Sequence, residues 1–268
     1  MSSASLLPLL RMSIAAQTEA ADAAQPLAAE VKPMSKDDQA WLAAAMAELS
    51  KNPVDEMKKL VAVIKDDAQR SPDEVLEALQ NLIGFVEHVD LARDLHKIGG
   101  LEPVVRLVRA GADSHVRAAA CDVLGSTTAN NPEPQQVALQ LGALPAVCAV
   151  LADADATTKE KAKAIFAISS MVRHNDMGYV EFVNKLHGFK LLHAVLETHT
   201  DKDGLPARRK AAFLLEYLVA RAPVTAKPMA PSFVPTLRAC LEADAEDEAF
   251  GEHARNVLEA MMKALTES

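Results

Sequence analysis

The chain has 268 residues, of which half are apolar and only 4% are aromatic, and its formal net charge is −9. The negative charge argues against a main role in binding nucleic acid or anionic lipid, whose phosphates attract basic surfaces. No apolar run approaches the roughly 20 residues that a helix needs to span a bilayer, so we expect no membrane segment.

The cysteines indicate a reducing compartment. There are three of them, Cys121, Cys148 and Cys240, so they cannot all pair with one another, and no C-x-x-C spacing occurs. The sequence also lacks an N-x-S/T glycosylation site. Free cysteines without glycosylation sites are typical of intracellular proteins, and we expect Cys121 to be a small buried apolar residue.

Residues 1–33 carry a short apolar patch and then an Ala-rich stretch without a helical period. Pro8 interrupts the patch and Arg11 lies inside it, which is unlike a secretory signal. A mitochondrial transit peptide is the less favoured alternative, because no acidic residue precedes Glu19 but arginine is scarce. We predict a flexible N-terminal segment with a short apolar motif.

Helix-start signals predict a cap of helices over residues 34–89. Ser35 with Asp38 starts one helix, and Ser71 followed by Pro72 and Glu74 starts another. Serine accepts hydrogen bonds from the free N–H groups of the first turn, and proline is tolerated there because it lacks one. The sequence therefore predicts helices ahead of the repeating part of the chain.

Three units of about forty residues follow, predicted at 90–131, 132–175 and 176–222. Arg117 aligns with Lys161 at an offset of 44 residues, and Lys163 aligns with Lys210 at an offset of 47. A capping box of Thr157 and Glu160 starts the long helix of the central unit. A helical unit that recurs at this period is typical of an α-solenoid.

Each unit is predicted to hold a short first helix, a second helix and a long third helix. Glycine permits the left-handed residue that ends the first helix at Gly99, Gly142 and His187-Gly188. The second helices are predicted at Leu101–Val108, Leu144–Leu151 and Phe189–Leu196. The third helices are predicted at 114–130, 158–174 and about 206–221.

Residues 223–268 are predicted to form a degenerate last repeat. Pro223, Pro228 and Pro231 spoil its first helix, as expected of a terminal unit. The fold class is therefore all-α, an armadillo-repeat right-handed α-solenoid over 34–268, with about four repeats and a helical N-terminal cap. A two-helix HEAT repeat is the alternative, and it would lack the short first helix.

Motifs of the common enzyme classes do not occur in the sequence. It contains no G-x-S-x-G elbow, no P-loop and no H-E-x-x-H. His187 and His193 have no carboxylate at metal-ligand spacing, and the basic runs Lys159–Lys163 and Arg208–Lys210 are expected to be solvated. We therefore predict a protein that is not an enzyme, with no catalytic residue, cofactor or metal.

A binding surface remains. In an armadillo solenoid the third helices line the inner face, and Ala164–Ser170 matches the A-L-W-A-L-S-N run of peptide receptors of this fold. This match and the repeat offsets give a ladder of outward positions at Asp122, Ser126, Phe166, Ser170, Phe213 and Tyr217, and one turn further on lie Asn130, His174 and Arg221. The repeats contain no Trp, and the six ladder positions lack the Asn that holds extended peptides, so a folded partner fits better than a nuclear-localisation peptide.

Two stretches resemble signature sequences of one armadillo family. They are Val86–Gly100, reading VEHVDLARDLHKIGG, and Ala164–Arg173, reading AIFAISSMVR. The family comprises nucleotide exchange factors of the Fes type, called Hsp-binding protein one in animals, which act on the seventy-kilodalton heat-shock chaperone. The resemblance covers about residues 35–222.

The resemblance has local departures. Leu9–Ala15 resembles the leading motif of the family, with Met12 where Trp is common. Leu91 and Arg93 stand where the family commonly has Asn.

The resemblance implies a co-chaperone that binds the nucleotide-binding domain of the heat-shock chaperone and promotes the release of ADP and of the client protein. By position within the matching stretches, it implies partner contacts at Ala92, Asp94 and Arg173. A cytoplasmic monomer is expected, with the nucleus as a second compartment. The alternative function is an armadillo scaffold that binds another folded protein with no effect on nucleotide.

Overall fold

The computed structural model describes residues 35–49, 52–110, 113–198 and 202–266, and within them it contains helices and no strand. The chain divides into two compact units, Met1–Lys51 and Asn52–Ser268. In the first unit, α2 (Lys36–Leu49) follows Ser35, whose hydroxyl accepts a hydrogen bond from the N–H of Asp38 at 3.1 Å. The predicted N-terminal segment 1–33 lies outside the described residues.

The second unit starts with two helices whose first turns are capped. They are α3 (Pro53–Lys65) and α4 (Pro72–Val86), separated by the short η2 (Asp67–Gln69). Ser71 and Glu74 form the predicted capping box, since each side chain accepts the backbone N–H of the other, at 3.3 and 2.9 Å. The helix start predicted at Ser71 is therefore confirmed. The helix α2 belongs to the other compact unit, because the chain divides after Lys51.

Three modules of three helices follow, in the order that the sequence predicts. The first helices are α5 (Val89–Lys97), α8 (Pro132–Gln140) and α11 (Asp176–Val180), the last continued by the π-helical turn η3 (Glu181–Lys185). The second helices are α6 (Leu101–Ala110), α9 (Ala143–Ala152) and α12 (Gly188–Thr198). The third helices are α7 (Ser114–Thr128), α10 (Thr158–Val172) and, after the short η4 (Lys202–Gly204), α13 (Leu205–Arg221).

The last module has a shortened first helix because proline recurs in it. Its elements are α14 (Pro223–Ala226), η5 (Lys227–Met229), α15 (Ala230–Ala243) and α16 (Glu248–Thr266). The three-helix pattern of the preceding modules excludes the two-helix alternative for the described repeats.

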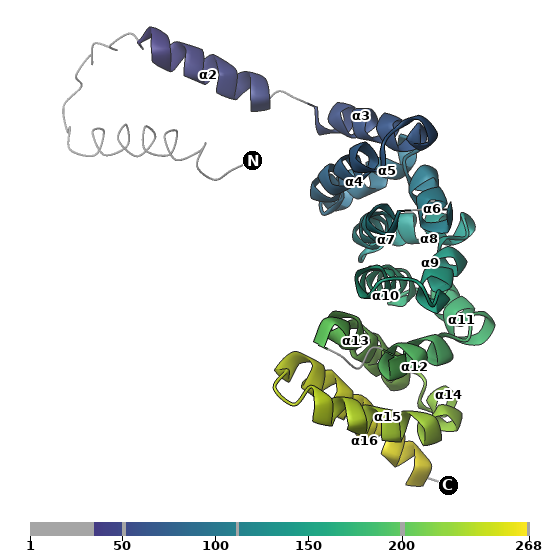
Figure 1. Ribbon diagram of the computed structural model, residues 1–268. Coiled ribbons are helices and arrows are strands. Elements are labelled where there is room, and N and C mark those ends of the chain that lie inside the picture. The colour runs from purple at the N-terminus through teal and green to yellow at the C-terminus, as the bar shows by residue number, and fades with distance from the viewer. Residues whose placement is uncertain (1–34, 50–51, 111–112, 199–201, 267–268) are drawn as a thin grey trace, which may run out of the picture. The chain divides into compact units, whose positions relative to one another are not determined.

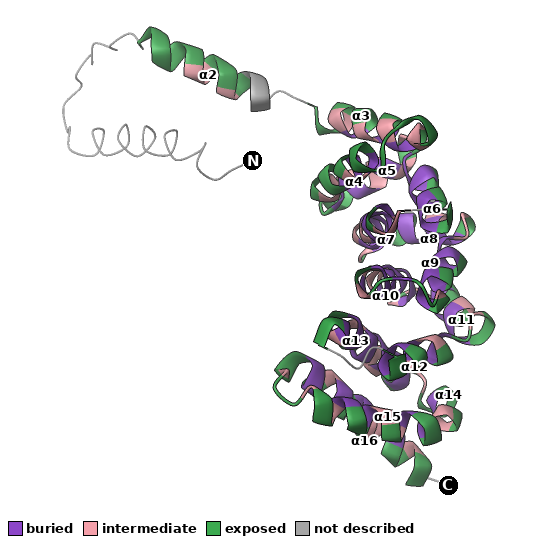
Figure 2. Cartoon of the chain, in the orientation of Figure 1, coloured by how far each residue is buried: buried purple, intermediate pink, exposed green. Residues whose placement is uncertain are grey.

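The third helices stack on one another, which places successive repeats side by side. α7 packs between α4 and α10, α10 packs on α13, and α13 packs on α16 (Figure 1). The helix faces that meet one another are buried (purple in Figure 2), and the buried apolar residues are mainly Ala, Val and Leu. Each fully buried Leu or Ile contributes about 1.5–3 kcal/mol, so a core with few aromatic residues suffices.

Left-handed residues end the short first helices. Gly99 has φ +71° and Gly142 has φ +67°, as predicted. In the third repeat the left-handed residue is His187, at φ +54°, and not Gly188. Gly188 has a different role, because a Cβ there would lie 2.4 Å from Cε1 of Phe182, so glycine allows the close approach of that ring.

Two of the three third helices end two residues earlier than predicted, whereas α13 ends at Arg221, as predicted. α7 stops at Thr128 and α10 at Val172, because Asn130 and His174 adopt φ values of +52° and +57°. A left-handed residue cannot continue a right-handed helix, and these two polar residues close the helix where glycine does so elsewhere.

The basic runs were expected to be solvated, and for two of their residues this is wrong. Arg208 is 1% exposed and Lys161 is 7% exposed. Arg117, at the equivalent position one repeat earlier, donates from Nε to Glu160 at 2.5 Å, and its Nη2 lies 3.0 Å from Asp153. These positions face the neighbouring repeat, where a carboxylate compensates the partly buried charge of Arg117 and the buried charge of Arg208.

Candidate partner-binding face

The outward side chains of the third helices lie on one face, as the repeat offsets predict. α7 packs on α10 and α10 on α13, so equivalent positions are neighbours in space. All of them are partly or fully exposed. We call this surface the third-helix face, and it consists of Asp122 and Ser126 on α7, Phe166 and Ser170 on α10, and Phe213 and Tyr217 on α13.

A pocket of about 380 Å³ lies at the C-terminal ends of α4 and α7. It is lined by Val86, Glu87, Val89, Ala92, Ser126, Ala129, Asn130, Asn131 and Phe166. The pocket therefore brings together four of the predicted site residues, Ala92, Ser126, Asn130 and Phe166. Ala92 is only 1% exposed, so its methyl group forms part of the wall rather than a protruding contact. We call this the Ala92 pocket.

Phe166 lies across Gly125 of the preceding repeat. A Cβ at position 125 would stand 2.5 Å from Cδ1 of the Phe166 ring, so glycine makes room for the ring. The ammonium group of Lys210 lies over the same ring, 5.1 Å from its centroid. Phe166 is thus held between α7 and α13, and its position depends on both neighbouring repeats.

A line of charged groups crosses the third-helix face. Lys163 forms an ion pair with Asp122. Lys210 is partly buried, and this burial lowers its pKa, with a further contribution from the positive charge of Lys163. The described residues contain no carboxylate bonded to Lys210, which contacts the Phe166 ring instead. Asp122 is therefore paired with Lys163, and its charge also acts on Lys210, which has no carboxylate bonded to it among the described residues.

Arg173 lies at the end of α10 and is held by aromatic rings of α13. Its guanidinium carbon lies 4.6 Å from the centroid of Phe213 and 5.5 Å from that of Tyr217. Its Nε is buried and has no hydrogen-bond partner among the described residues. The predicted contacts Arg173, Phe213 and Tyr217 thus form one cluster.

Tyr217 also bonds to the backbone at the end of α10, in the preceding repeat, and to Arg221 on its own helix. Its hydroxyl accepts the backbone N–H of His174 at 3.0 Å and a hydrogen bond from Nη1 of Arg221 at 2.9 Å. Arg221 also stacks on the Tyr179 ring at 4.2 Å and forms an ion pair with Asp176. The predicted residues His174 and Tyr217 are therefore brought together.

The predicted contact Asp94 belongs neither to the Ala92 pocket nor to the cluster that Arg173 forms with Phe213 and Tyr217. It pairs with Lys97 on the same helix, at 3.0 Å, and does not line the Ala92 pocket. The structure thus gathers Ala92 with Ser126, Asn130 and Phe166, and Arg173 with His174, Phe213 and Tyr217.

No grouping of His, Cys, Asp and Glu that could hold a metal ion occurs among the described residues. Burial raises the pKa of Cys121 and of Cys148 to about 12, so neither thiol is ionised near neutral pH. Cys121 is fully buried, as predicted.

In the part of the chain that the structure describes, no single helix has the length and hydropathy of a membrane span. α8 and α9 reach those values only when they are taken together, and they meet at an angle of 74°.

A family model described as "SIL1/FES1/HPBP1 C-terminal domain" matches residues 91–226, just over half of the chain. The chain belongs to this family. A second model, described as "Nucleotide exchange factor Fes1", matches residues 6–95. The resemblance inferred from Val86–Gly100 and Ala164–Arg173 is therefore confirmed.

Two relatives illustrate the range of similarity within the SIL1/FES1/HPBP1 family. "Hsp70-binding protein 1" of Homo sapiens is 30% identical over 224 residues, which cover 79% of this chain and 59% of the relative. "Hsp70 nucleotide exchange factor FES1" of Debaryomyces hansenii is 27% identical over 136 residues, which cover 51% of this chain and 47% of the relative. The chain thus spans about half to six tenths of the length of these relatives.

The fold of this SIL1/FES1/HPBP1 family member is similar to that of a solved armadillo protein. "ARO (armadillo repeats only protein)" from Plasmodium falciparum superposes with a TM-score of 0.59 at 12% identity, covering 86% of this chain and all of the other. At this identity the similarity concerns the fold alone. It confirms the predicted all-α armadillo solenoid.

Sequence reasoning missed three features of the site in this family member. Lys163 and Lys210 were assigned to solvated runs although they lie 47 residues apart, which is the repeat offset and places them on the same face. Gly125 carried no signal, because its role depends on the Phe166 ring of the next repeat. Tyr179 lies on a first helix, and only the fold brings it to Arg221.

Proposed function

We propose that this chain is a co-chaperone without catalytic activity that binds the nucleotide-binding domain of Hsp70 and promotes the release of ADP and then of the client. One observation carries this proposal. Every predicted contact residue, from Ala92 to Tyr217, lies within the 91–226 segment that matches the SIL1/FES1/HPBP1 domain. The names of the relatives refer to Hsp70 binding and nucleotide exchange, which supports the same assignment.

The mechanism needs no covalent step. A protein that binds the ADP-free arrangement of the chaperone more tightly than the ADP-bound one must weaken ADP binding by the same factor, by linkage. The binder must be stiff, because a surface that adapted equally to both arrangements would shift nothing. The contacts that hold Phe166 and Arg173 across neighbouring repeats support such stiffness.

The chemistry of the third-helix face suits an acidic folded surface. Lys210 and Arg173 are cations held against aromatic rings, with no carboxylate bonded to either among the described residues. A partly desolvated cation gains most from a carboxylate that arrives with a partner. The Ala92 pocket, whose wall includes the Phe166 ring under Lys210, would take an apolar side chain of the same partner.

Release of fluorescent ADP from purified Hsp70 tests the proposal. We expect a stoichiometric amount of the chain to accelerate release, and Ser126→Arg in the Ala92 pocket to abolish most of the acceleration. Lys59→Gln on α3, outside the third-helix face, is the matched control and should act as the wild type. Binding without acceleration would favour the alternative of an armadillo scaffold.

We further propose a monomer that acts in the cytoplasm, with the nucleus as a second compartment, and that contacts neither nucleic acid nor membrane. The proposed organisation is an N-terminal segment 1–33 that aids client release and a solenoid over 34–268. Its parts are 34–89, 90–131, 132–175, 176–222 and 223–268. The mass measured by light scattering and the location of a tagged full chain in cells test these points.

A further inference from the structure

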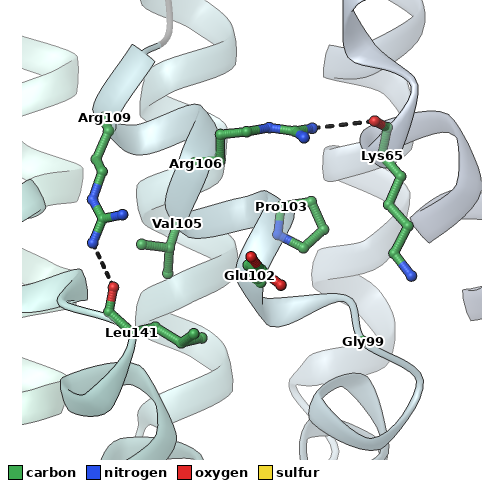
Figure 3. Close-up of a pocket in the computed structure, with 8 residues that line it drawn as sticks. All are labelled: Lys65, Gly99, Glu102, Pro103, Val105, Arg106, Arg109 and Leu141. Carbon is green, nitrogen blue, oxygen red and sulfur yellow. Dashed lines mark hydrogen bonds between the residues drawn. The ribbon is translucent and has the colours of Figure 1, made fainter.

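A second pocket, of about 560 Å³, lies between the end of α3, the start of α6 and the turn that joins α8 to α9 (Figure 3). None of its lining residues comes from α4, α7, α10, α13 or α16. It is therefore separate from the third-helix face, and the proposed Hsp70 interaction does not use it. We call it the second-helix pocket.

Two arginines of α6 are fixed at its rim by helix ends of the neighbouring repeats. Nη2 of Arg106 donates to the carbonyls of Ile64 and Lys65 at 3.1 and 3.2 Å, and also to Asp67 at 2.8 Å. Nη2 of Arg109 donates to the carbonyls of Leu141 and Gly142, the latter at 3.2 Å. Each guanidinium uses one terminal nitrogen in this way, and its Nε and Nη1 have no partner among the described residues.

Two left-handed glycines make room for cations at this rim. A Cβ at Gly142 would lie 2.7 Å from Nη2 of Arg109, and a Cβ at Gly99 would lie 3.3 Å from Nζ of Lys65. The left-handed backbone favours glycine at both positions, and a larger residue at Gly142 would also displace the end of the Arg109 side chain. Nζ of Lys65 has no acceptor among the described residues.

The remaining charge at the pocket is positive. Asp67 is already bonded to Arg106, which leaves Lys65, Arg109 and the exposed Glu102. Glu102 has no hydrogen-bond or ion-pair partner in the described part of the chain. The pocket also has an apolar part formed by Pro103, Val105 and Leu141.

We propose that the second-helix pocket binds an acidic peptide segment in which a carboxylate neighbours an aliphatic side chain. The carboxylate accepts hydrogen bonds from Lys65 and from the unused donors of Arg109, since a guanidinium fork matches a carboxylate. The aliphatic side chain packs on Val105 and Leu141. The volume is in the range of pockets that hold a few side chains or a small ligand.

The probe is a fluorescein-labelled peptide Gly-Ser-Leu-Glu-Leu-Glu-Ser-Gly, titrated with the full chain and followed by anisotropy. We expect saturable binding that weakens with salt, and no binding of the analogue with Gln in place of both Glu residues. Lys65→Gln should weaken binding about fivefold, the size expected of one exposed charge pair. Glu102→Gln should strengthen it, because it removes the unpaired acid.

The control is Lys59→Gln, which removes a lysine from α3 outside the pocket, where it pairs with Glu56 at 2.8 Å. Neither Lys65 Nζ nor Glu102 makes a bond within the described residues, so both variants should fold as the wild type. The proposal is overturned if the Glu peptide does not bind, or if Lys65→Gln and Lys59→Gln weaken binding equally. ADP release from Hsp70 should be unchanged in both Lys65→Gln and Glu102→Gln, which separates this site from the proposed function.

Discussion

Arg208 at the start of α13 and Asp244 after α15 form a buried two-point ion pair. Nε and Nη2 of Arg208 donate to the two carboxylate oxygens at 2.7 and 2.6 Å, and the side chains are 1% and 7% exposed. Arg117 and Asp153 make an equivalent contact two repeats earlier, at a less buried position. The fold thus repeats an ion pair that links the third helix of one repeat to the next repeat.

Removing one member of the buried Arg208–Asp244 pair should strongly lower the free energy of unfolding. We expect Arg208→Met to lower the free energy of unfolding by about 3–5 kcal/mol, because Asp244 would remain buried without its cation. Arg209→Met is the control, since Arg209 pairs with Asp247 at an exposed position and should cost less than about 1 kcal/mol. Urea unfolding measures the free energy of unfolding of both variants. Equal losses in the two variants would contradict the view that the buried pair matters more than the exposed one.

The effects of substitutions at Gly125 and at Phe166 on stability should be coupled. Gly125→Ala is expected to cost about 1–3 kcal/mol, because the new methyl group overlaps the Phe166 ring. In Gly125→Ala combined with Phe166→Ala, the two losses should be less than additive, since the overlap disappears. A double-mutant cycle by urea unfolding measures the coupling, and strict additivity would show that the ring does not rest on Gly125.

Replacing Arg173 should weaken binding to Hsp70 strongly and lower the free energy of unfolding only slightly. Arg173→Ala removes contacts with the rings of Phe213 and Tyr217, so we expect a loss of about 1 kcal/mol in stability. Binding to Hsp70 should weaken by at least about tenfold. Calorimetric titration measures the binding, and Arg173→Lys should restore part of it. A loss of binding only in proportion to unfolded protein would remove Arg173 from the contact surface.

Ala92→Arg should block the Ala92 pocket without unfolding the chain. The pocket, of about 380 Å³, gives the longer side chain a way out, but Ala92 is 1% exposed, so we expect a loss of about 1–3 kcal/mol in stability and a chain that is still folded. Hsp70 binding should be lost, because the pocket is filled. Thermal unfolding by circular dichroism and the ADP-release assay measure the two effects. If the variant is unfolded, Ser126→Arg at the more exposed wall replaces it.

Stability should fall in acid. The pKa of Asp113 is lowered by the N–H of Val116, and that of Asp247 by Arg209. A carboxyl with a lower pKa in the folded state stabilises the fold fully above its ordinary pKa near 4, and this contribution is lost as the pH falls through the folded pKa.

Asp113→Asn tests this dependence, because asparagine keeps the helix cap and does not titrate there. Its unfolding free energy should fall less than that of the wild type between pH 6 and pH 3, as measured in urea. An equal fall in both proteins would show that Asp113 does not contribute.

The elements that the sequence predicted well depend on local signals. The capping boxes at Ser71–Glu74 and Thr157–Glu160 involve residues three apart, and both occur in the structure. The repeat offset likewise predicted which outward positions share a face. These signals require no knowledge of what packs against the helix.

The elements that it predicted poorly depend on neighbours about forty residues away. Arg208 reads as part of a solvated run, and only its pairing with Asp244 makes burial tolerable. In the third repeat His187 is the left-handed residue while Gly188 accommodates the Phe182 ring, and the sequence alone does not separate these two roles. The composition and residue spacing of one helix do not indicate which residues of the neighbouring repeats will contact it.

The ring and charge contacts between third helices each join one repeat to the next, as in Lys210 on Phe166, Arg173 on Phe213, and Phe213 beside His253. Small rotations at such joints add up along a row of modules. An exchange of one side chain at a single joint would therefore displace the far end of the row by more than it displaces the adjacent helix. Since Phe166, Arg173 and Phe213 are also predicted contact residues, a substitution at such a joint would change the spacing of the outward positions together with their chemistry.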